Sequence, residues 1–354
     1  MTDQKKNVWL KTLIIVVIVL LIPKFFQLIG GHDVEKVREK MEKSLLEEYG
    51  QEFVVDRIGT RAIRGETHYQ ARIYPKSIVG TNKEGDSYYY AKAGVEKKAF
   101  GRLGKVGAGY ETVQIKIEAE NYVRSKAREI FGDRIRLKAD VKFKKKKEGN
   151  DYFSWQIRSN FEKLLEETKA DPKNKRIELE LYVYIFDRID DEDEKEERRK
   201  QIFEFVQYLK EEDLFKYLEM GVIFIDERVL APSYDKYKRK IFLSEKVEKE
   251  VYGETVYLPP MELRKEMSEV LQNEIDNMSE EELLANIKRI RKGSVNDLRG
   301  FNTNYGIFIY SWGILEIKYT SALKRRDINR DYSKLMHVKL GEGTKYIYLN
   351  KMGE

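Results

Sequence analysis

The sequence contains no cysteine, and it has only three histidines. The absence of cysteine excludes disulfide bonds, thiolate metal sites and cysteine nucleophiles. His32, His68 and His337 are far apart in the sequence and show none of the spacings typical of a metal site. We therefore predict no metal site and no cofactor.

Recognisable catalytic motifs are also missing. There is no G-x-S-x-G nucleophile motif, and the carboxylates are too numerous to single out an acid pair. The glycine-rich segment FGRLGKVGAGYE has Val106 where a P-loop has Ser or Thr, so we interpret it as a flexible connection. We name no catalytic residue and expect a protein that is not an enzyme.

Neither sign of charge is in clear excess. The chain has 67 Lys and Arg residues against 61 Asp and Glu residues, and they are interleaved. This balance does not favour nucleic acid as a partner. A hydrophobic fraction of 41% indicates folded domains, and 354 residues are enough for two or three of them.

One long hydrophobic run lies near the N-terminus. It extends from Val8 to Ile29, and the stretch from Thr12 to Pro23 within it is uncharged. A membrane-spanning helix needs ~20 mostly apolar residues, and Lys11 and Lys24 lie where their side chains can reach the headgroups. We predict a single-pass signal-anchor helix that holds the chain in the membrane lipid.

The orientation of this helix follows from its basic flank. Lys5, Lys6 and Lys11 precede the apolar run, so the positive-inside rule places the N-terminus in the cytoplasm and the remaining chain outside the cell membrane. A cleaved signal peptide is the alternative. No small-x-small cleavage site follows the run, which favours the uncleaved anchor.

The folded part opens with a helix. Val34, Val37, Met41 and Leu45 form one apolar stripe, and Gly50 ends it. Asp33 is the expected N-cap. The strands predicted next are Phe53 to Ile58, His68 to Tyr74 and Ser87 to Ala93.

The order of helix and strand then recurs. A helix from Ala119 to Phe131 ends at Gly132, and a strand with alternating polarity follows from Ile135 to Phe143. The junctions at Gly50 and Gly132 share the order aromatic, Gly, polar, polar, apolar, which suggests an internal duplication. Further elements predicted are a helix from Trp155 to Glu167, a strand from Ile177 to Phe186, and a helix capped by Ser279 and Glu282.

These patterns predict an α+β protein with one N-terminal transmembrane helix and repeated helix-plus-antiparallel-strand units. The predicted division is a cytoplasmic tip and anchor at 1–31, an α+β domain with the duplication at 32–150, a second α+β domain at 151–258, and C-terminal helices and hairpins at 259–354. The pair Pro259-Pro260 marks the last boundary.

The segment KMEKSLLEEYGQEFVV, from Lys40 to Val55, resembles a pattern in small membrane-anchored or lipid-anchored extracytoplasmic proteins of Gram-positive bacteria. In those uncharacterised proteins a helix ends in Tyr-Gly-x-Glu-Phe-Val-Val and a β-meander follows. The similarity covers about Val34 to Pro75. It implies an anchored chain outside the membrane, it transfers no functional residue, and the lipobox cysteine of the lipid-anchored members is absent here.

Two groups of residues are candidate contact surfaces. The lysines could attract anionic lipid headgroups or a cell-wall polyanion, although a solvated hairpin tip is the favoured interpretation. The tyrosines could present aromatic surface to a glycan or a partner protein, although strand tyrosines are often half core and half exposed. The two groups are Lys142, Lys144, Lys145, Lys146 and Lys147, and Tyr88, Tyr89 and Tyr90.

The function expected from these features is a membrane-tethered, surface-facing binding or scaffolding protein of the cell envelope, with an envelope protein or a cell-wall polymer as its partner. Two alternatives remain open. One is an envelope hydrolase that uses carboxylates the sequence does not reveal. The other is a cytoplasm-facing, membrane-tethered binder of nucleic acid or a regulatory protein.

Overall fold

The computed structural model describes residues 33–63, 66–98, 102–146, 152–154, 159–251, 254–258, 260–290, 303–311, 313–314 and 343–348. The chain divides into two compact units. Unit 1 holds the chain up to Gly80 together with Tyr89–Val113, and unit 2 holds Thr81–Tyr88 together with the chain from Gln114 onward. The four-part division expected from the sequence stays a prediction.

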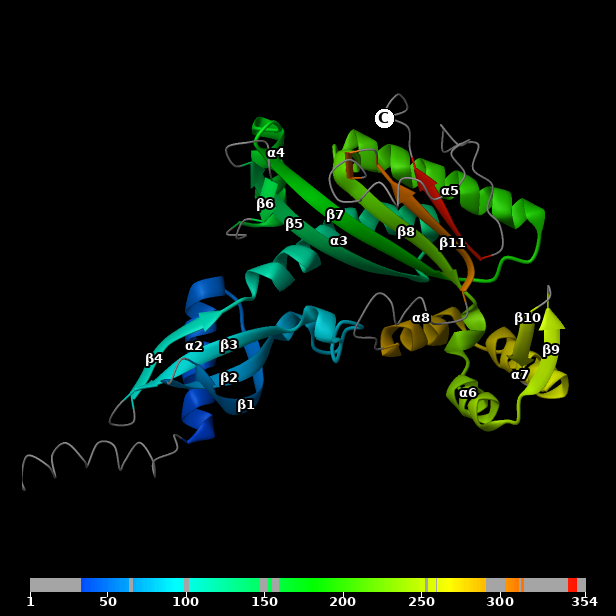
Figure 1. The fold of residues 1–354 in the computed structure, drawn as a ribbon, viewed down its shortest axis with the longest axis horizontal. Helices are drawn as coiled ribbons and strands as arrows, with labels where there is room; N and C mark the ends of the chain where they lie inside the picture. Colours follow the sequence, from blue (N-terminus) through cyan, green and yellow to red (C-terminus); the bar gives the residue numbers. More distant parts are fainter. Residues whose placement is uncertain are drawn as a thin grey trace, which may run out of the picture. The chain divides into compact units, whose positions relative to one another are not determined.

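Unit 1 is one helix on a four-stranded antiparallel sheet of order β1-β2-β3-β4 (Figure 1). The helix places Val37, Met41 and Leu45 against the sheet, and all three are fully buried. The elements are α2 (Val34–Tyr49), β1 (Phe53–Ile63), β2 (Glu66–Pro75), the short 3-10 helix η1 (Lys76–Ile78), β3 (Ala91–Lys98) and β4 (Arg102–Ala108).

The ends of α2 are those that the sequence predicts. The Asp33 carboxylate accepts a hydrogen bond of 3.0 Å from the Glu35 backbone N–H. Gly50 has φ 67°, the left-handed conformation in which glycine is favoured. Gly132, which follows the predicted helix ending at Phe131, has φ 85° and so shares the left-handed conformation of Gly50. The internal duplication itself stays a prediction.

Two predictions for residues 87–111 are wrong. The strand expected from Ser87 is a 3-10 helix, η2 (Ser87–Tyr89), and the strand begins only at Ala91. The glycine-rich segment expected to be a connection is β4, an edge strand paired with β3. Glycine suits that strand because a Cβ on Gly104 would lie only 3.0 Å from the Cβ of Glu96.

Unit 2 is built on a six-stranded sheet of order β12-β11-β8-β7-β5-β6. A separate two-stranded hairpin, β9–β10, follows α6. The elements are α3 (Glu111–Phe131), β5 (Ile135–Lys146), β6 (Tyr152–Ser154), α4 (Phe161–Ala170), β7 (Lys175–Phe186), α5 (Glu192–Glu211), η4 (Phe215–Tyr217), β8 (Leu218–Ile225), η5 (Glu227–Leu230), α6 (Tyr234–Leu243), β9 (Val247–Val251), β10 (Glu254–Leu258), α7 (Met261–Asp276), α8 (Glu280–Arg289), β11 (Thr303–Tyr310) and β12 (Gly343–Tyr348).

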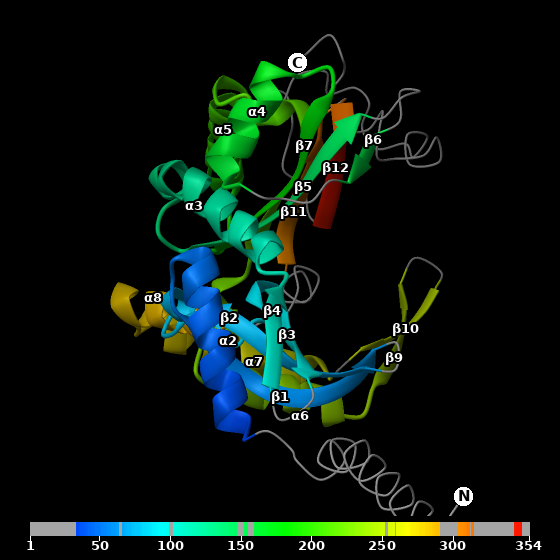
Figure 2. The ribbon, with the colours of Figure 1, turned by 90° about the vertical axis from the view of Figure 1, so that its left-hand side faces the viewer.

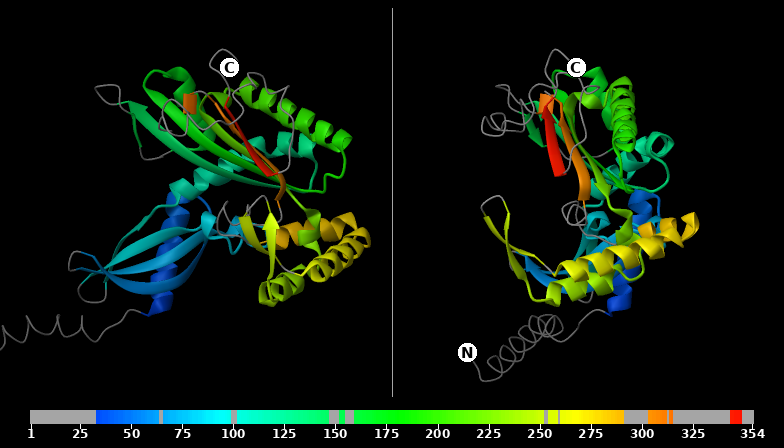
Figure 3. Two further views of the ribbon diagram at one scale, coloured as in Figure 1. Left: turned by 45° about the vertical axis from the view of Figure 1, so that its right-hand side comes forward. Right: turned by 90° about the vertical axis from the view of Figure 1, so that its right-hand side faces the viewer.

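Two groups of helices pack against the large sheet. Helices α3, α4 and α5 pack on one face, where alternate strand residues such as Leu181 and Val183 form the larger core (Figure 2). Helices α6, α7 and α8 form a separate group with η5 beyond the ends of the strands (Figure 3). Tyr182, Tyr184 and Ile223 of the sheet belong to the same hydrophobic core as this group. This second group carries the candidate site.

The sheet of unit 2 is mixed, whereas the sequence predicts antiparallel pairing throughout. Strands β7 and β8 are parallel, and so are β11 and β12. The helix α5, with 20 residues, connects β7 to β8 and returns the chain to the end of the sheet at which β7 begins, so β8 runs in the same direction as β7. A crossover of this kind cannot be read from the alternation of a single strand.

The expectation of a transmembrane helix is corrected by the structure. None of the helices in the described residues is both long and apolar enough to cross a membrane. The two longest, α3 and α5, have charged residues along most of their length. The predicted span from Val8 to Ile29 lies outside the described residues. The fold class of the described residues is α+β with antiparallel and mixed sheets.

Candidate functional site

Helix α6 separates two kinds of side chain. Tyr234 and Tyr237 lie three residues apart on one face, and both are buried in the second core of unit 2. Lys236 and Arg239 lie on the other side of the helix and are exposed. The segment from Tyr234 to Lys246 contains five cationic residues and two acidic ones, so this part of unit 2 is locally basic.

Helix α7 holds α6 in an antiparallel arrangement. The Tyr237 hydroxyl donates to Glu266 at 3.1 Å, and the Lys240 ammonium lies 3.0 Å from the same carboxylate. At the other end of the pair, the backbone N–H of Ser233 donates to Glu274 at 2.9 Å. Hydrogen bonds from Lys240 and then from Tyr237 lower the pKa of Glu266. Glu266 thus stays ionised and neutralises Lys240.

Three large apolar side chains are exposed where this helix pair ends. Phe242 and Leu243 are each 80% exposed, and Met261 is 62% exposed. Because α6 and α7 are antiparallel, the last turn of α6 and the first turn of α7 lie at the same end of the pair. We call Phe242, Leu243 and Met261 the apolar tip. Contiguous exposed apolar side chains commonly mark a binding surface.

Cations adjoin the apolar tip. Arg239 precedes Phe242 and Leu243 by three and four residues, which places these side chains on neighbouring positions of the helix surface. Within the described residues neither Lys236 nor Arg239 takes part in an ion pair. We call these two residues the cationic face. An apolar tip beside a cationic face suits an acidic partner segment with apolar anchors.

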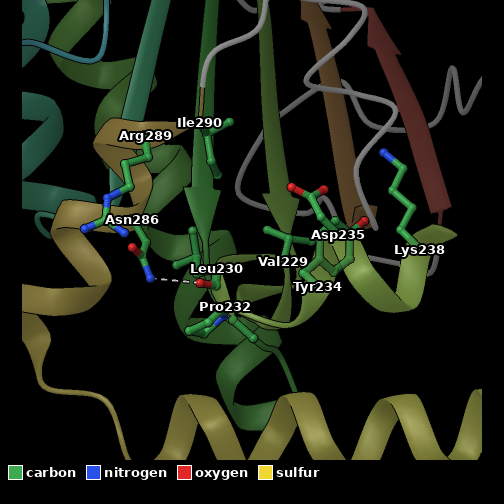
Figure 4. Close-up of a pocket in the computed structure, with 10 residues that line it drawn as sticks. Val229, Leu230, Pro232, Tyr234, Asp235, Lys238, Asn286, Arg289 and Ile290 are labelled. Atoms are coloured by element: carbon green, nitrogen blue, oxygen red, sulfur yellow. Dashed lines mark hydrogen bonds between the residues drawn. The ribbon is translucent and has the colours of Figure 1, made fainter. Parts of the chain in front are cut away.

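A cavity of about 410 Å³ lies between α6 and α8 (Figure 4). Asp235 and Lys238 rise from α6 on one side of it, and Ile290 lies on the opposite side. The Asn286 amide donates to the backbone carbonyl of Leu230 at 2.9 Å. This hydrogen bond joins α8 to η5, whose residues Val229 and Leu230 form the apolar floor of the cavity.

The chemistry of this cavity is suited to binding. Burial raises the pKa of Tyr234, and the Asp235 carboxylate adds to the rise, so the phenol stays protonated at neutral pH. The lining has one carboxylate, cationic and amide groups and an apolar floor, but no histidine, serine or cysteine to act as a nucleophile or a base. These walls can hold a polar segment that extends from the apolar tip along α6.

A second group of charged residues is buried in unit 2. Asp86 accepts a hydrogen bond of 3.1 Å from Arg136 and forms an ion pair with Lys138, and both Asp86 and Lys138 are fully buried. The Lys83 side-chain nitrogen contacts Glu120, whose side chain is also fully buried. We call this group the buried ion cluster. It joins the segment Thr81–Tyr88 to α3 and β5.

Burial lowers the pKa of both lysines in the cluster. The pKa of Lys83 falls to about 6, with the nearby Arg124, Lys138 and Arg136 cations adding to the effect. The pKa of Lys138 falls to about 8, mainly through burial, against an opposing effect of Asp86. Because Asp86 pairs with both Arg136 and Lys138 inside one unit, and all three are buried, the evident role of the cluster is to fix the chain segments that it joins.

The cluster predicts a pH-dependent stability. Between the folded-state pKa of Lys83, about 6, and its ordinary value of 10.5, the unfolded chain binds a proton that the folded chain lacks. Stability therefore rises with pH in this window, by at most about 1.4 kcal/mol per pH unit for one group. Urea unfolding of the Lys83→Met variant from pH 7 to pH 9 is expected to show a smaller slope than the wild type. The exposed Lys105→Met variant is the control, and an equal slope in all three proteins would contradict the assignment.

Three carboxylates of unit 2 lie side by side on neighbouring strands, and each is engaged by another side chain. Asp140, Glu180 and Glu219 lie in register on β5, β7 and β8. Each already has a partner, since Lys116 lies 3.3 Å from Asp140, Lys142 lies 3.1 Å from Glu180, and the Tyr182 hydroxyl lies 3.5 Å from Glu219. Across the described residues, no group of three His, Cys, Asp or Glu side chains could hold a metal ion.

The lysines of the predicted contact surface differ in their environments, and two of them form ion pairs. Lys142 pairs with Glu180, and Lys144 pairs with Glu178 at 2.7 Å. The ammonium of Lys145 lies 5.8 Å from the ring centre of Phe143. Lys146 is part of β5, and Lys147 lies outside the described residues. Contact of these lysines with a polyanion stays a prediction, with the charge of two of them already balanced.

The three tyrosines have three different environments. Tyr88 donates to the backbone carbonyl of Ala139 in unit 2, and Tyr89 is 1% exposed. Tyr90 lies on the sheet of unit 1, where its ring centre is 4.9 Å from that of Tyr74 and 4.4 Å from the Arg72 guanidinium. The three tyrosines therefore do not form one aromatic surface, and Tyr90 pairs with another tyrosine ring, that of Tyr74.

The apolar tip is not among the residues that the sequence singles out. Its signal is a break in the helical phase of α6. Tyr234 and Tyr237 pack inward and Ile241, four residues later, is half-buried, whereas Phe242 and Leu243 follow outside this stripe and are exposed. The basic and aromatic character of α6 is visible in the sequence, but the exposure of its last two residues requires the structure.

No protein-family model matches this chain, and no curated protein matches it. Among solved structures, it is similar to a DUF5037 family protein from Ruminococcus gnavus, with 14% sequence identity and a TM-score of 0.31. The alignment covers 57% of this chain and 79% of that one. A similarity at this level carries no conclusion about fold or function. The resemblance to Gram-positive extracytoplasmic proteins stays a prediction.

Proposed function

We propose that this protein is a binding module that docks an acidic, apolar-anchored segment of a partner protein on the apolar tip and cationic face of α6. The observation that carries the proposal is the 80% exposure of Phe242 and Leu243. Full burial of a Phe or Leu side chain contributes roughly 1.5–3 kcal/mol, so these two residues can anchor a complex. An envelope protein, the partner expected from the sequence, would fit if it carries such a segment.

The positive charge of the cationic face favours a partner segment with negative charge. Lys236 and Arg239 would pair with acidic side chains of the partner segment, and this pairing would accelerate association and disfavour basic segments. The cavity beside Asp235 and Lys238 would receive polar groups of the same segment.

The proposal is tested with a synthetic helical peptide that has leucines on one face and glutamates on the other. Fluorescence anisotropy is used to measure its affinity for the full chain and for the variant Phe242→Ser with Leu243→Ser. The affinity is expected to fall at least about tenfold in the variant, because two apolar anchors are lost. Leu46→Ser is the matched control, since Leu46 is an exposed leucine on α2 in unit 1.

The electrostatic part has its own comparison. Arg239→Glu is expected to weaken binding of the acidic peptide, while Arg102→Glu, an exposed arginine of β4, leaves it unchanged. A second peptide with lysines in place of the glutamates is expected to bind more weakly than the acidic one. Equal affinity of the wild type and the double serine variant for the acidic peptide would refute the proposal.

A further inference from the structure

A second cavity in unit 2, of about 430 Å³, lies where α4, α5 and η4 meet. Its apolar lining includes Leu165, Phe215 and Tyr217. Leu165 and Phe215 belong to the core and are 7% and 3% exposed, so the cavity reaches the edge of the hydrophobic core. A volume of this size is in the range of sites that hold small ligands.

Lysines surround this apolar lining. The ammonium of Lys210 lies 4.9 Å from the ring centre of Phe215, and that of Lys216 lies 5.5 Å from the ring centre of Tyr217. A third lysine, Lys169, is 3.4 Å from Asp213, the one acidic residue of the lining, which balances its charge. Within the described residues Lys216 is in no ion pair. The rim is therefore cationic.

The wall that carries Lys216 and Tyr217 is fixed by backbone contacts. The Ser311 hydroxyl donates to the backbone carbonyl of Lys216 at 2.8 Å. Gly313 packs so closely that a Cβ there would lie 2.5 Å from the same carbonyl oxygen and 3.1 Å from the Tyr217 ring. A wall held in this way exists before a ligand arrives, which reduces the entropy lost on binding.

We infer that this cavity binds a small apolar monocarboxylate, with its apolar body against Phe215 and Tyr217 and its carboxylate at Lys216. Apolar walls favour a hydrocarbon or aromatic body, and a cationic rim with one balanced acid favours a single negative charge. The site is separate from the apolar tip, and neither site depends on the other.

The probe for this site is 3-phenylpropionate, titrated into the full chain by isothermal titration calorimetry. Its amine counterpart, 3-phenylpropylamine, has the same apolar body and the opposite charge. We expect saturable binding of the carboxylate at one site and no measurable binding of the amine. Equal binding of both compounds would indicate non-specific adsorption and would overturn the inference, as would no binding of the carboxylate.

Variants separate this site from general effects of charge. Lys216→Glu is expected to weaken 3-phenylpropionate at least about tenfold, because a charge-assisted hydrogen bond is replaced by repulsion. Lys163→Glu, an exposed lysine on α4 away from the cavity lining, is the matched control and should leave the affinity unchanged. Equal weakening by both variants would overturn the assignment. Lys216→Glu should still bind the acidic peptide, so the two proposals fail independently.

Discussion

Replacing Asp86 with alanine is expected to lower the free energy of unfolding by about 3–5 kcal/mol. Asp86 is fully buried, and its carboxylate is shared by Arg136, which is 3% exposed, and by Lys138, which is fully buried. Removing the carboxylate leaves two cations in the interior without their shared acceptor. The cost of burying unbalanced charge exceeds that of losing an ordinary hydrogen bond.

Urea unfolding followed by circular dichroism measures this effect. Asp86→Asn keeps the shape and one acceptor oxygen, so it is expected to lie between the wild type and the alanine variant. Asp133→Ala is the surface control, because the ion pair of Asp133 with Arg128 is more than half exposed on both sides. Exposed pairs contribute about 0–1 kcal/mol. A loss for Asp86→Ala as small as that for Asp133→Ala would show that the buried ion cluster does not stabilise unit 2.

Replacing Gly221 with alanine is expected to cost about 2–3 kcal/mol through overpacking. Gly221 lies on β8 between Tyr182 of β7 and Phe308 of β11, which are its register partners in the sheet. A Cβ at this position would be 2.8 Å from the Tyr182 ring and 2.9 Å from the Phe308 ring. Both rings are buried and packed edge to face, so neither can move without disturbing the second core.

The same unfolding measurement includes two comparisons. Gly107→Ala on β4 has no atom within 4 Å of the added carbon and is expected to change stability little. Phe308→Leu in the Gly221→Ala background removes part of the obstructing ring and is expected to recover some of the loss. An alanine at Gly221 that is as well tolerated as one at Gly107 would contradict the close packing described for this face.

Local patterns in the sequence are enough to predict several elements. The cap at Asp33, the glycine at position 50 and the Ser279–Glu282 capping box all appear in the structure as expected. They are confirmed because each depends on residues within one or two turns of the same helix. The strands predicted at Ile135–Phe143 and Ile177–Phe186 are likewise present, within β5 and β7, although β7 is buried on both faces along most of its length and β5 along its first part.

Features that depend on distant partners could not be predicted. Strand β4 is glycine-rich and becomes a strand only because β3 pairs with it. The parallel pairing of β7 and β8 depends on the path of α5, which single-strand alternation does not contain. The buried ion cluster joins Asp86 to Lys138, residues 52 positions apart in the sequence, so nothing local identifies the pair. The apolar tip could not be predicted either, because the exposure of Phe242, Leu243 and Met261 depends on how the rest of the chain packs around them.

The docking surface on α6 is tested most directly by hydrogen–deuterium exchange of the full chain with and without the acidic leucine–glutamate peptide. The account predicts slower exchange confined to the last turns of α6 and the first turn of α7, around Phe242 and Met261, and no such slowing in the variant Phe242→Ser with Leu243→Ser. Unchanged exchange in these turns under conditions where the peptide is bound, or slowing confined to other elements, would contradict it.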